Sequence, residues 1–89
     1  MITKVRKRDG RIVLYDKEKV VNAIFKGMES VNKADLNEAR KLADIVEKEL
    51  EEGFGKKETP HVEEIQDLIE KALIKEGLVE VAKSFILYR

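Results

Sequence analysis

Lys7, Arg8 and Lys19 are the side chains of this sequence best suited to chemistry, and the chemistry they suit is the binding of an anion. Lysine and arginine form charge-assisted hydrogen bonds with phosphate oxygens. Lys19 also lies where a helix is expected to begin, and the free backbone N–H groups of a helix start favour a bound anion. Together with Arg89 at the end of the sequence, these cations predict a site for a polyphosphate.

The composition excludes several other kinds of site. The 89 residues include no cysteine and one histidine, so no thiolate or multi-histidine metal site can form. No nucleophile–base–acid set and no glycine-rich phosphate loop of known spacing appears, and His61 is expected to be an exposed polar residue. We therefore expect a binding domain and not an enzyme. The absence of a long apolar run and of a signal peptide predicts a cytoplasmic protein without membrane contact.

Charge is distributed unevenly along a chain whose formal net charge is zero. Residues 4–19 hold seven basic and three acidic side chains, whereas residues 35–52 hold seven acidic and three basic ones. A basic N-terminal patch favours an anionic partner, and the alternative is an ordinary solvated surface.

The residues around the first two cations predict a β-hairpin. Asp9-Gly10 lies between two runs that can form strands, Val5–Arg8 and Arg11–Tyr15. Such a pair favours a two-residue type I′ turn, in which both central residues adopt positive φ. Because an isolated hairpin is only marginally stable in water, one of its faces must pack against the rest of the chain.

The turn determines which side chains share that packing face. A two-residue loop pairs Val5 with Leu14 and Lys7 with Ile12, and opposed residues lie on the same face. Three apolar side chains and Lys7 are therefore expected on the packing face. An unpaired ammonium group there is costly, so Lys7 either reaches solvent along its stem or meets an anion. Val5 and Val20 could hold a flat base beside that anion.

The remaining sequence predicts four helices, and the fold class is mainly α (α+β). Apolar residues recur at helical spacing over residues 17–30, 36–52, 60–76 and from 79 onward. We expect one domain over residues 1–89, as the N-terminal fragment of a longer chain, because the last helix has no stop signal. The expected N-caps are Asp16, Asp35 and Thr59, the last followed by Pro60 as the first helical residue, and the expected stops are Gly53 and Gly77.

The start of the first helix carries two lysines, Lys17 and Lys19. Cations in a first turn oppose the helix dipole. A phosphate near Lys19 would reverse that effect, and the alternative is that both side chains lean away into solvent.

Over almost its whole length the sequence resembles the ATP-cone domain. Each matching motif is short, but together they occur in the family's order and at similar spacing. The motifs are Val5-Arg6-Lys7-Arg8-Asp9-Gly10-Arg11, Tyr15-Asp16-x-x-Lys19-Val20 with Ala23-Ile24, Val62-Glu63-Glu64-Ile65-Gln66-Asp67 with Glu70-Lys71, and Val81-Ala82-Lys83 with Ile86-x-Tyr88-Arg89.

The resemblance implies a small N-terminal β-hairpin lid packed on a four-helix bundle, with ATP or dATP beneath the lid as an allosteric ligand, accompanied by Mg²⁺. Such domains stand at the N-terminus of ribonucleotide reductase large subunits, where they sense the ATP to dATP ratio. The implied partners are a reductase catalytic domain in the same chain and a further copy in a homo-oligomer. Related repressors carry a zinc ribbon, which the absence of cysteine disfavours here.

The resemblance also implies roles for individual residues. Lys7, Arg8 and Lys19 would contact phosphates, and Thr59 and Val62 would form the floor of the site. Glu63 departs from the pattern, because some members have histidine there, and a carboxylate facing a triphosphate would be unfavourable. Val13 stands where some members have a polar residue. The full set of expected nucleotide-binding residues is Val5, Lys7, Arg8, Tyr15, Asp16, Lys19, Val20, Thr59, Val62 and Arg89, with Val5, Tyr15, Asp16 and Val20 near the base or sugar.

Two other functions remain open at this point. One is a structural or oligomerisation domain whose nucleotide site has degenerated, although the matching cations are intact. The other is a nucleic-acid-binding module that uses the basic hairpin as a ribbon, which neutral net charge disfavours. The sequence does not choose between ATP and dATP, whose difference is a single hydroxyl group.

Overall fold

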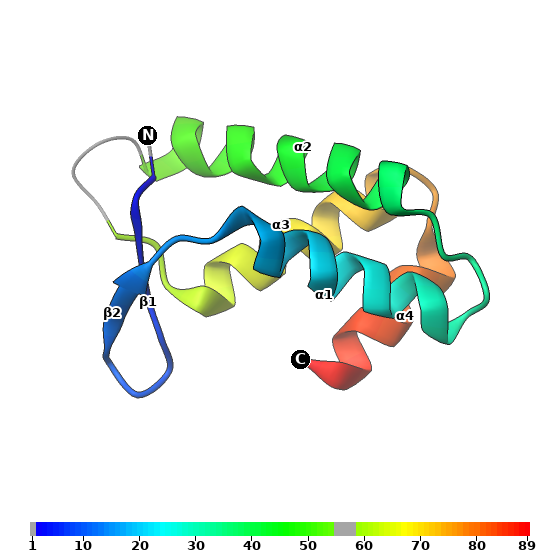
Figure 1. The fold of residues 1–89 in the computed structure, drawn as a ribbon, viewed down its shortest axis with the longest axis horizontal. Coiled ribbons are helices and arrows are strands. Elements are labelled where there is room, and N and C mark those ends of the chain that lie inside the picture. The colour runs from blue at the N-terminus through cyan, green and yellow to red at the C-terminus, as the bar shows by residue number, and fades with distance from the viewer. Residues whose placement is uncertain (1, 55–58) are drawn as a thin grey trace.

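An antiparallel hairpin is followed by four helices in the part of the chain that the structure describes, residues 2–54 and 59–89 of a computed structural model (Figure 1). The prediction of a mainly α fold with an N-terminal hairpin is confirmed. The elements are β1 (Lys4–Arg6), β2 (Ile12–Leu14), α1 (Lys17–Ser30), α2 (Leu36–Phe54), α3 (Val62–Lys75) and α4 (Val79–Tyr88).

The hairpin loop contains three residues, so the predicted type I′ turn is wrong. The Gly10 N–H donates to the Lys7 carbonyl at 2.9 Å, and the Lys7 N–H donates to the Arg11 carbonyl at 2.8 Å. Gly10 has a φ of 89°, while Asn32 is the only residue other than glycine with positive φ among those described. Asp9 thus lacks the positive φ that a type I′ turn requires, and the loop has the geometry of a tight turn closed by a left-handed glycine.

The longer loop shifts the strand register by one residue and so moves every side chain of β2 to the opposite face. Val5 lies opposite Val13, and Arg6 lies opposite Ile12. Val5 is buried and Lys7 is half-buried, so the prediction that Lys7 lies on the packing face is confirmed. Ile12 and Leu14 point to the other face and are 49% and 77% exposed, so their predicted burial is wrong.

The first two helices begin where their caps predict. Asp16 accepts a hydrogen bond from the Glu18 N–H at 3.0 Å, and Asp35 accepts one from the Glu38 N–H at 3.1 Å. Gly53 does not end α2, which continues to Phe54. The Phe54 side chain packs against the core, and this contact offsets the low helix propensity of glycine. The loop predicted after Gly53 lies largely outside the described residues.

The third helix begins two residues later than predicted, at Val62. The Arg6 N–H donates to the Pro60 carbonyl at 2.9 Å, and His61 forms a bridge with Arg6. This pairing keeps the chain extended beside β1, so Thr59 is not the cap and Pro60 is not helical. His61 is the N-cap: its Nδ1 accepts the Glu63 N–H, and the Glu64 side chain accepts the His61 N–H. The predicted stop of this helix is confirmed, because α3 ends at Lys75, shortly before Gly77. Gly77 has a φ of 79°.

The four helices form a bundle in which each helix packs against two neighbours. α1 and α3 each pack against both α2 and α4. The core lies between them and includes fully buried side chains from all four helices, among them Ile24, Leu42, Leu73 and Val81. Figure 1 shows the hairpin at the end of the bundle where α3 begins, and Val5 joins the core from β1. The hairpin loop therefore lies over one end of the bundle.

None of the described helices is long and apolar enough to cross a membrane.

Candidate functional site

A pocket lies beneath the hairpin loop, and we call it the hairpin pocket. Its volume is about 390 Å³. Three separate parts of the chain line it, because the start of α3 and the end of α4 both lie near the loop. The lining residues are Lys7, Arg8 and Asp9 from the hairpin, Val62 and Gln66 from α3, and Tyr88 and Arg89 from the end of the chain.

A second cavity, the α1–α4 cleft, adjoins the hairpin pocket. Its volume is about 680 Å³. The two cavities share Gln66, Tyr88 and Arg89 as lining residues, so they lie next to each other, and we call the pair the hollow. Both volumes lie within or near the range of small-molecule sites. The α1 side chains of the cleft are Lys19, Asn22, Ala23, Lys26 and Ser30, with Gly27 between them.

Three lysines of this hollow, Lys7, Lys19 and Lys26, remain available to a ligand. Within the described residues, the ion pairs involve Arg8, Arg11, Lys17, Lys33, Arg40 and Arg89, and include none of these three lysines. Lys7 comes from the hairpin and Lys19 from the first turn of α1, so two separate elements direct positive charge toward one hollow. That arrangement suits an anion with several charges.

Lys17, two residues before Lys19, is positioned quite differently. Its ammonium group contacts Asp44 and lies 3.3 Å from Glu47 Oε2, both on α2. The hydrogen bond to Asp44, followed by that to Glu47, raises the pKa of Lys17. Lys17 thus neutralises part of the negative charge of α2, while Lys19 borders the cleft on another side of α1.

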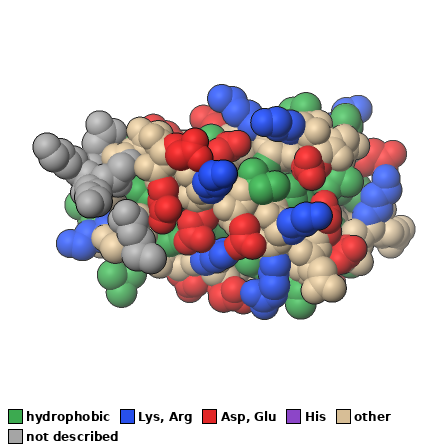
Figure 2. Space-filling view, turned by 90° about the horizontal axis from the view of Figure 1, so that it is seen from above, with side chains coloured by type: hydrophobic (Ala, Val, Ile, Leu, Met, Phe, Trp, Pro, Cys, Tyr) green, Lys and Arg blue, Asp and Glu red, His purple; other side chains and the backbone are tan. Residues whose placement is uncertain are grey.

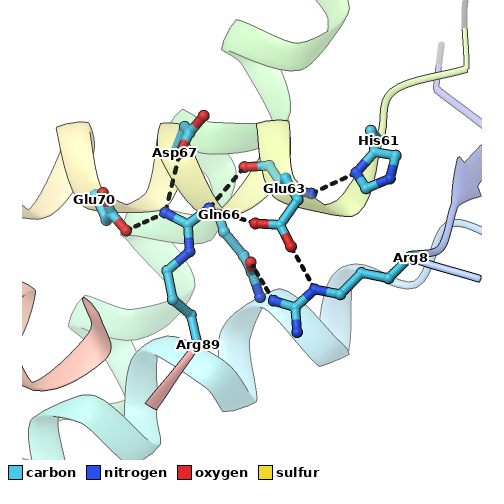
Figure 3. A network of polar contacts seen from close by, with 7 residues as sticks. All are labelled: Arg8, His61, Glu63, Gln66, Asp67, Glu70 and Arg89. Carbon is cyan, nitrogen blue, oxygen red and sulfur yellow. Dashed lines mark hydrogen bonds and ion pairs between the residues drawn. The ribbon is translucent and has the colours of Figure 1, made fainter. Parts of the chain in front are cut away.

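Two arginines of the hairpin pocket are held by acidic side chains of α3 (Figure 3). Arg8 Nε donates to Glu63 Oε1, and Arg8 Nη2 donates to Gln66 Oε1 at 3.1 Å. Arg89 contacts three acidic residues: Glu63 Oε2 at 2.8 Å, Asp67 Oδ1 at 3.0 Å, and Glu70. Glu63 therefore lies between the two guanidinium groups and accepts from both.

This network changes the proton affinity of its members. Hydrogen bonds from Arg89, and then from Arg8, lower the pKa of Glu63. Hydrogen bonds to Glu70 and Glu63 raise the pKa of Arg89. Both groups are thus held in their charged forms. The unfavourable carboxylate expected at position 63 is neutralised by arginines in the unliganded chain.

Five of the predicted site residues do not line the hollow. Val5 and Val20 are buried in the core close to it. Asp16 caps α1, and Thr59 is half-buried in the segment before α3. The Tyr15 hydroxyl is buried without a hydrogen-bond partner among the described residues. Contact of these residues with a nucleotide stays a prediction.

Burial raises the pKa of Tyr15 to about 12, with a further contribution from the carboxylate of Glu47. The nearby charges come from Glu47, Glu51, Lys17 and Asp16. Tyr15 therefore lies near acidic residues of α2, and it is not among the residues that line the hairpin pocket.

The hollow contains residues that sequence reasoning did not assign to a site. Asn22 and Lys26 lie three and seven positions after Lys19, so helical spacing alone could have placed them on the same face. Tyr88 is 81% exposed and borders both cavities, beside Arg89. Its aromatic ring offers a surface on which a base could stack.

The face over α2 carries mixed charges. Figure 2 views the molecule from this side and shows acidic and basic side chains interspersed across the surface. The acidic stretch of the sequence lies in α2, where Asp44 and Glu47 pair with Lys17. On this face, no continuous basic surface of the kind that tracks a nucleic-acid backbone is visible.

The sequence matches the family model of the ATP cone domain over residues 3–89. It is 44% identical over 94 residues to a vitamin B12-dependent ribonucleoside-diphosphate reductase of Thermoplasma acidophilum, covering 100% of this chain and 12% of that protein. It is 34% identical over 86 residues to the reductase of the same description from Mycobacterium tuberculosis, covering 97% of this chain and 12% of that protein. It is 39% identical over 87 residues to the ribonucleoside-diphosphate reductase subunit alpha of Treponema pallidum, covering 93% of this chain and 10% of that protein. The chain thus spans about an eighth or less of the length of these relatives.

Proposed function

Because the chain belongs to the ATP-cone family, we propose that it binds ATP or dATP in the hairpin pocket and the adjoining α1–α4 cleft. By itself the chain is a small ATP-cone domain and not an enzyme, since most of each related reductase lies outside the matched region. One observation carries the proposal: Lys7 and Arg8 from the hairpin and Lys19 from α1 line two neighbouring cavities.

The proposed pose places the triphosphate near these three cations. Charge-assisted hydrogen bonds to phosphate are shorter and stronger than neutral ones, and Arg8 can bind two oxygens at once. Mg²⁺ enters with the nucleotide, because it is commonly held by phosphate oxygens together with few protein ligands. The base then lies toward Tyr88 and the apolar side chains of the cleft, including Ala23 and Phe85.

In the wider protein the domain acts as an allosteric regulator. The relatives are reductases, so the proposed partner is a reductase catalytic domain in the same chain, in the cytoplasm. Binding of ATP or dATP reports the ratio of these nucleotides and controls activity, and a further copy in a homo-oligomer is the second proposed partner. This regulatory step needs the nucleotide site, so a test of binding comes first.

Thermal unfolding with and without nucleotide tests the proposal. A ligand at about 100 times its dissociation constant stabilises the folded state by roughly 2.7 kcal/mol, so ATP or dATP with Mg²⁺ should raise the melting temperature. Duplex DNA added as a competitor should leave this shift unchanged. No shift with millimolar ATP or dATP would favour a structural domain with a degenerate site, and a shift abolished by DNA would favour a nucleic-acid-binding module.

A further inference from the structure

The carboxylate of Glu63 is bound to Arg8, one of the cations that line the hairpin pocket. Glu63 Oε1 accepts from Arg8 Nε, and Gln66 Oε1 accepts from Arg8 Nη2 at 3.1 Å, so α3 holds the guanidinium on two sides (Figure 3). Arg8 also borders the hairpin pocket. A donor required by the ligand is therefore already engaged by an internal anion.

We propose that Glu63 is an autoinhibitory competitor for polyphosphate: its carboxylate holds Arg8 in the unliganded chain and releases it when a nucleotide enters the hairpin pocket. This inference rests on the proposed function, because it concerns how tightly the same pocket binds. It assigns to Glu63 a role in setting the affinity of the pocket for nucleotide.

The two arginines that share Glu63 differ in how readily they can be released. Arg89 has three carboxylate partners, and its side chain is 18% exposed. Arg8 has Glu63 as its one carboxylate partner among the described residues, and the two side chains are 57% and 41% exposed. Glu63 can thus lose Arg8 and keep Arg89, while Arg89 stays neutralised throughout.

The exchange is energetically feasible because an exposed ion pair contributes little stability. A triphosphate offers several charged oxygens to the same guanidinium and so forms more charge-assisted hydrogen bonds than one carboxylate. Glu63 nevertheless opposes binding in two ways: Arg8 must first be released, and the freed carboxylate then repels the phosphates. Replacing the carboxylate by an amide removes the repulsion and weakens the hold on Arg8, because a neutral acceptor binds a guanidinium less strongly than an ionised one.

Calorimetric titration of the 89-residue chain with Mg²⁺-ATP compares Glu63→Gln with Asp67→Asn. Each variant removes one negative charge from the first turns of α3, but Asp67 contacts Arg89 and not Arg8. Glu63→Gln should bind about fivefold more tightly than the unmodified chain, since a surface ion pair weakens a competing ligand by about this factor. Asp67→Asn should change the dissociation constant by less than about twofold.

A double variant separates release of Arg8 from general charge repulsion. In an Arg8→Gln background there is no guanidinium to release, so most of the gain from Glu63→Gln should disappear. The competitor role would be overturned if Glu63→Gln raised the affinity for Mg²⁺-ATP equally with and without Arg8. It would also be overturned if Glu63→Gln and Asp67→Asn raised this affinity equally. If the unmodified chain binds ATP and Glu63→Gln binds no more tightly, this inference fails while the proposed function stands. If neither binds ATP, dATP or inorganic triphosphate, both fail.

The unmodified chain provides a second readout that does not depend on the folding of a variant. Nitrogen-15 NMR reports the Nε–H resonances of arginines. On saturation with Mg²⁺-ATP, the Arg8 resonance should shift strongly, because Glu63 is replaced by phosphate, and the Arg89 resonance should stay close to its unliganded position. A shift at Arg89 with none at Arg8 would contradict the exchange.

Discussion

Arg89 Nη2 donates a hydrogen bond to Glu63 Oε2 at 2.8 Å, which ties the end of α4 to the first turn of α3. The same guanidinium donates to the Glu63 carbonyl at 3.3 Å and contacts Asp67 and Glu70. These contacts hold together two of the three walls of the hairpin pocket. Arg89 therefore supports the shape of the pocket in the unliganded chain, a structural role distinct from the phosphate contact expected from the family pattern.

Replacing Arg89 by glutamine should destabilise the fold. The change leaves the half-buried Glu70 without its cation, and loss of a partner for a buried charged group typically costs roughly 1–3 kcal/mol. Urea denaturation measures the effect. Arg40→Gln is the matched control, because Arg40 pairs with Glu18 and both side chains are at least half exposed. An equal loss in the two variants would contradict the structural role of Arg89.

Tyr88→Ala should weaken the binding of nucleotides but not of inorganic triphosphate. Tyr88 borders both cavities, and stacking of a base on an aromatic ring contributes about 1–3 kcal/mol. Leu87→Ala is the control, since Leu87 is equally exposed, at 81%, and lines neither cavity. Calorimetric titration with ATP and with triphosphate measures both. If Tyr88→Ala lowered the affinities for ATP and for triphosphate by the same factor, the base would not lie on this ring.

Tyr15→Phe should stabilise the chain at neutral pH by roughly 1 kcal/mol, because it removes a buried hydroxyl that has no partner among the described residues. The pKa of Tyr15 is raised to about 12 from 10.0, so the unfolded chain loses this proton first. The part of the free energy of unfolding that is linked to this proton is fully present below pH 10 and is lost as the pH rises toward 12.

Denaturant midpoints between pH 7 and 12 compare the two chains. The phenylalanine variant should lack the alkaline loss caused by Tyr15. A lower neutral stability together with weaker ATP binding would instead place the Tyr15 hydroxyl in the nucleotide site, as the family pattern implies.

Acid should destabilise the fold through Glu63. Its pKa is lowered from 4.5 by hydrogen bonds from Arg89 and Arg8, so the unfolded chain takes up the proton first. The contribution of this carboxylate is complete above pH 4.5 and is lost as the pH falls through the lower folded-state value. Denaturant midpoints from pH 7 downward should fall less steeply for Glu63→Gln than for the unmodified chain. Parallel curves would show that the arginine contacts do not stabilise the ionised form.

Local rules predicted the elements whose signals lie within a few residues. Asp16 supplies the N-cap of α1, and apolar spacing gives the bounds Lys17–Ser30 correctly. The hairpin also forms where the Asp-Gly pair predicts it. The register differs because, of Asp9 and Gly10, only the glycine takes a positive φ, and one extra loop residue moves Ile12 and Leu14 to the exposed face.

Contacts between distant residues account for what the sequence did not predict. α3 starts late because Pro60 and His61 pair with Arg6, more than 50 positions earlier, and because histidine acts as the cap. The role of Glu63 depends on Arg8 and Arg89, which approach it from opposite ends of the chain. Residue type and position singled out Lys7, Arg8 and Lys19, the family resemblance implied the same three residues, and in the fold they line two neighbouring cavities.

The most direct test of the nucleotide site is a calorimetric titration with Mg²⁺-ATP and Mg²⁺-dATP of Lys19→Gln and Lys17→Gln. The two lysines lie in the same turn, but Lys19 borders the cleft and Lys17 pairs with Asp44. We predict saturable binding to the unmodified chain, a loss of roughly tenfold in affinity for Lys19→Gln, as expected for one charged hydrogen bond, and little change for Lys17→Gln. No measurable binding of either nucleotide, or equal affinity in all three chains, would contradict the account.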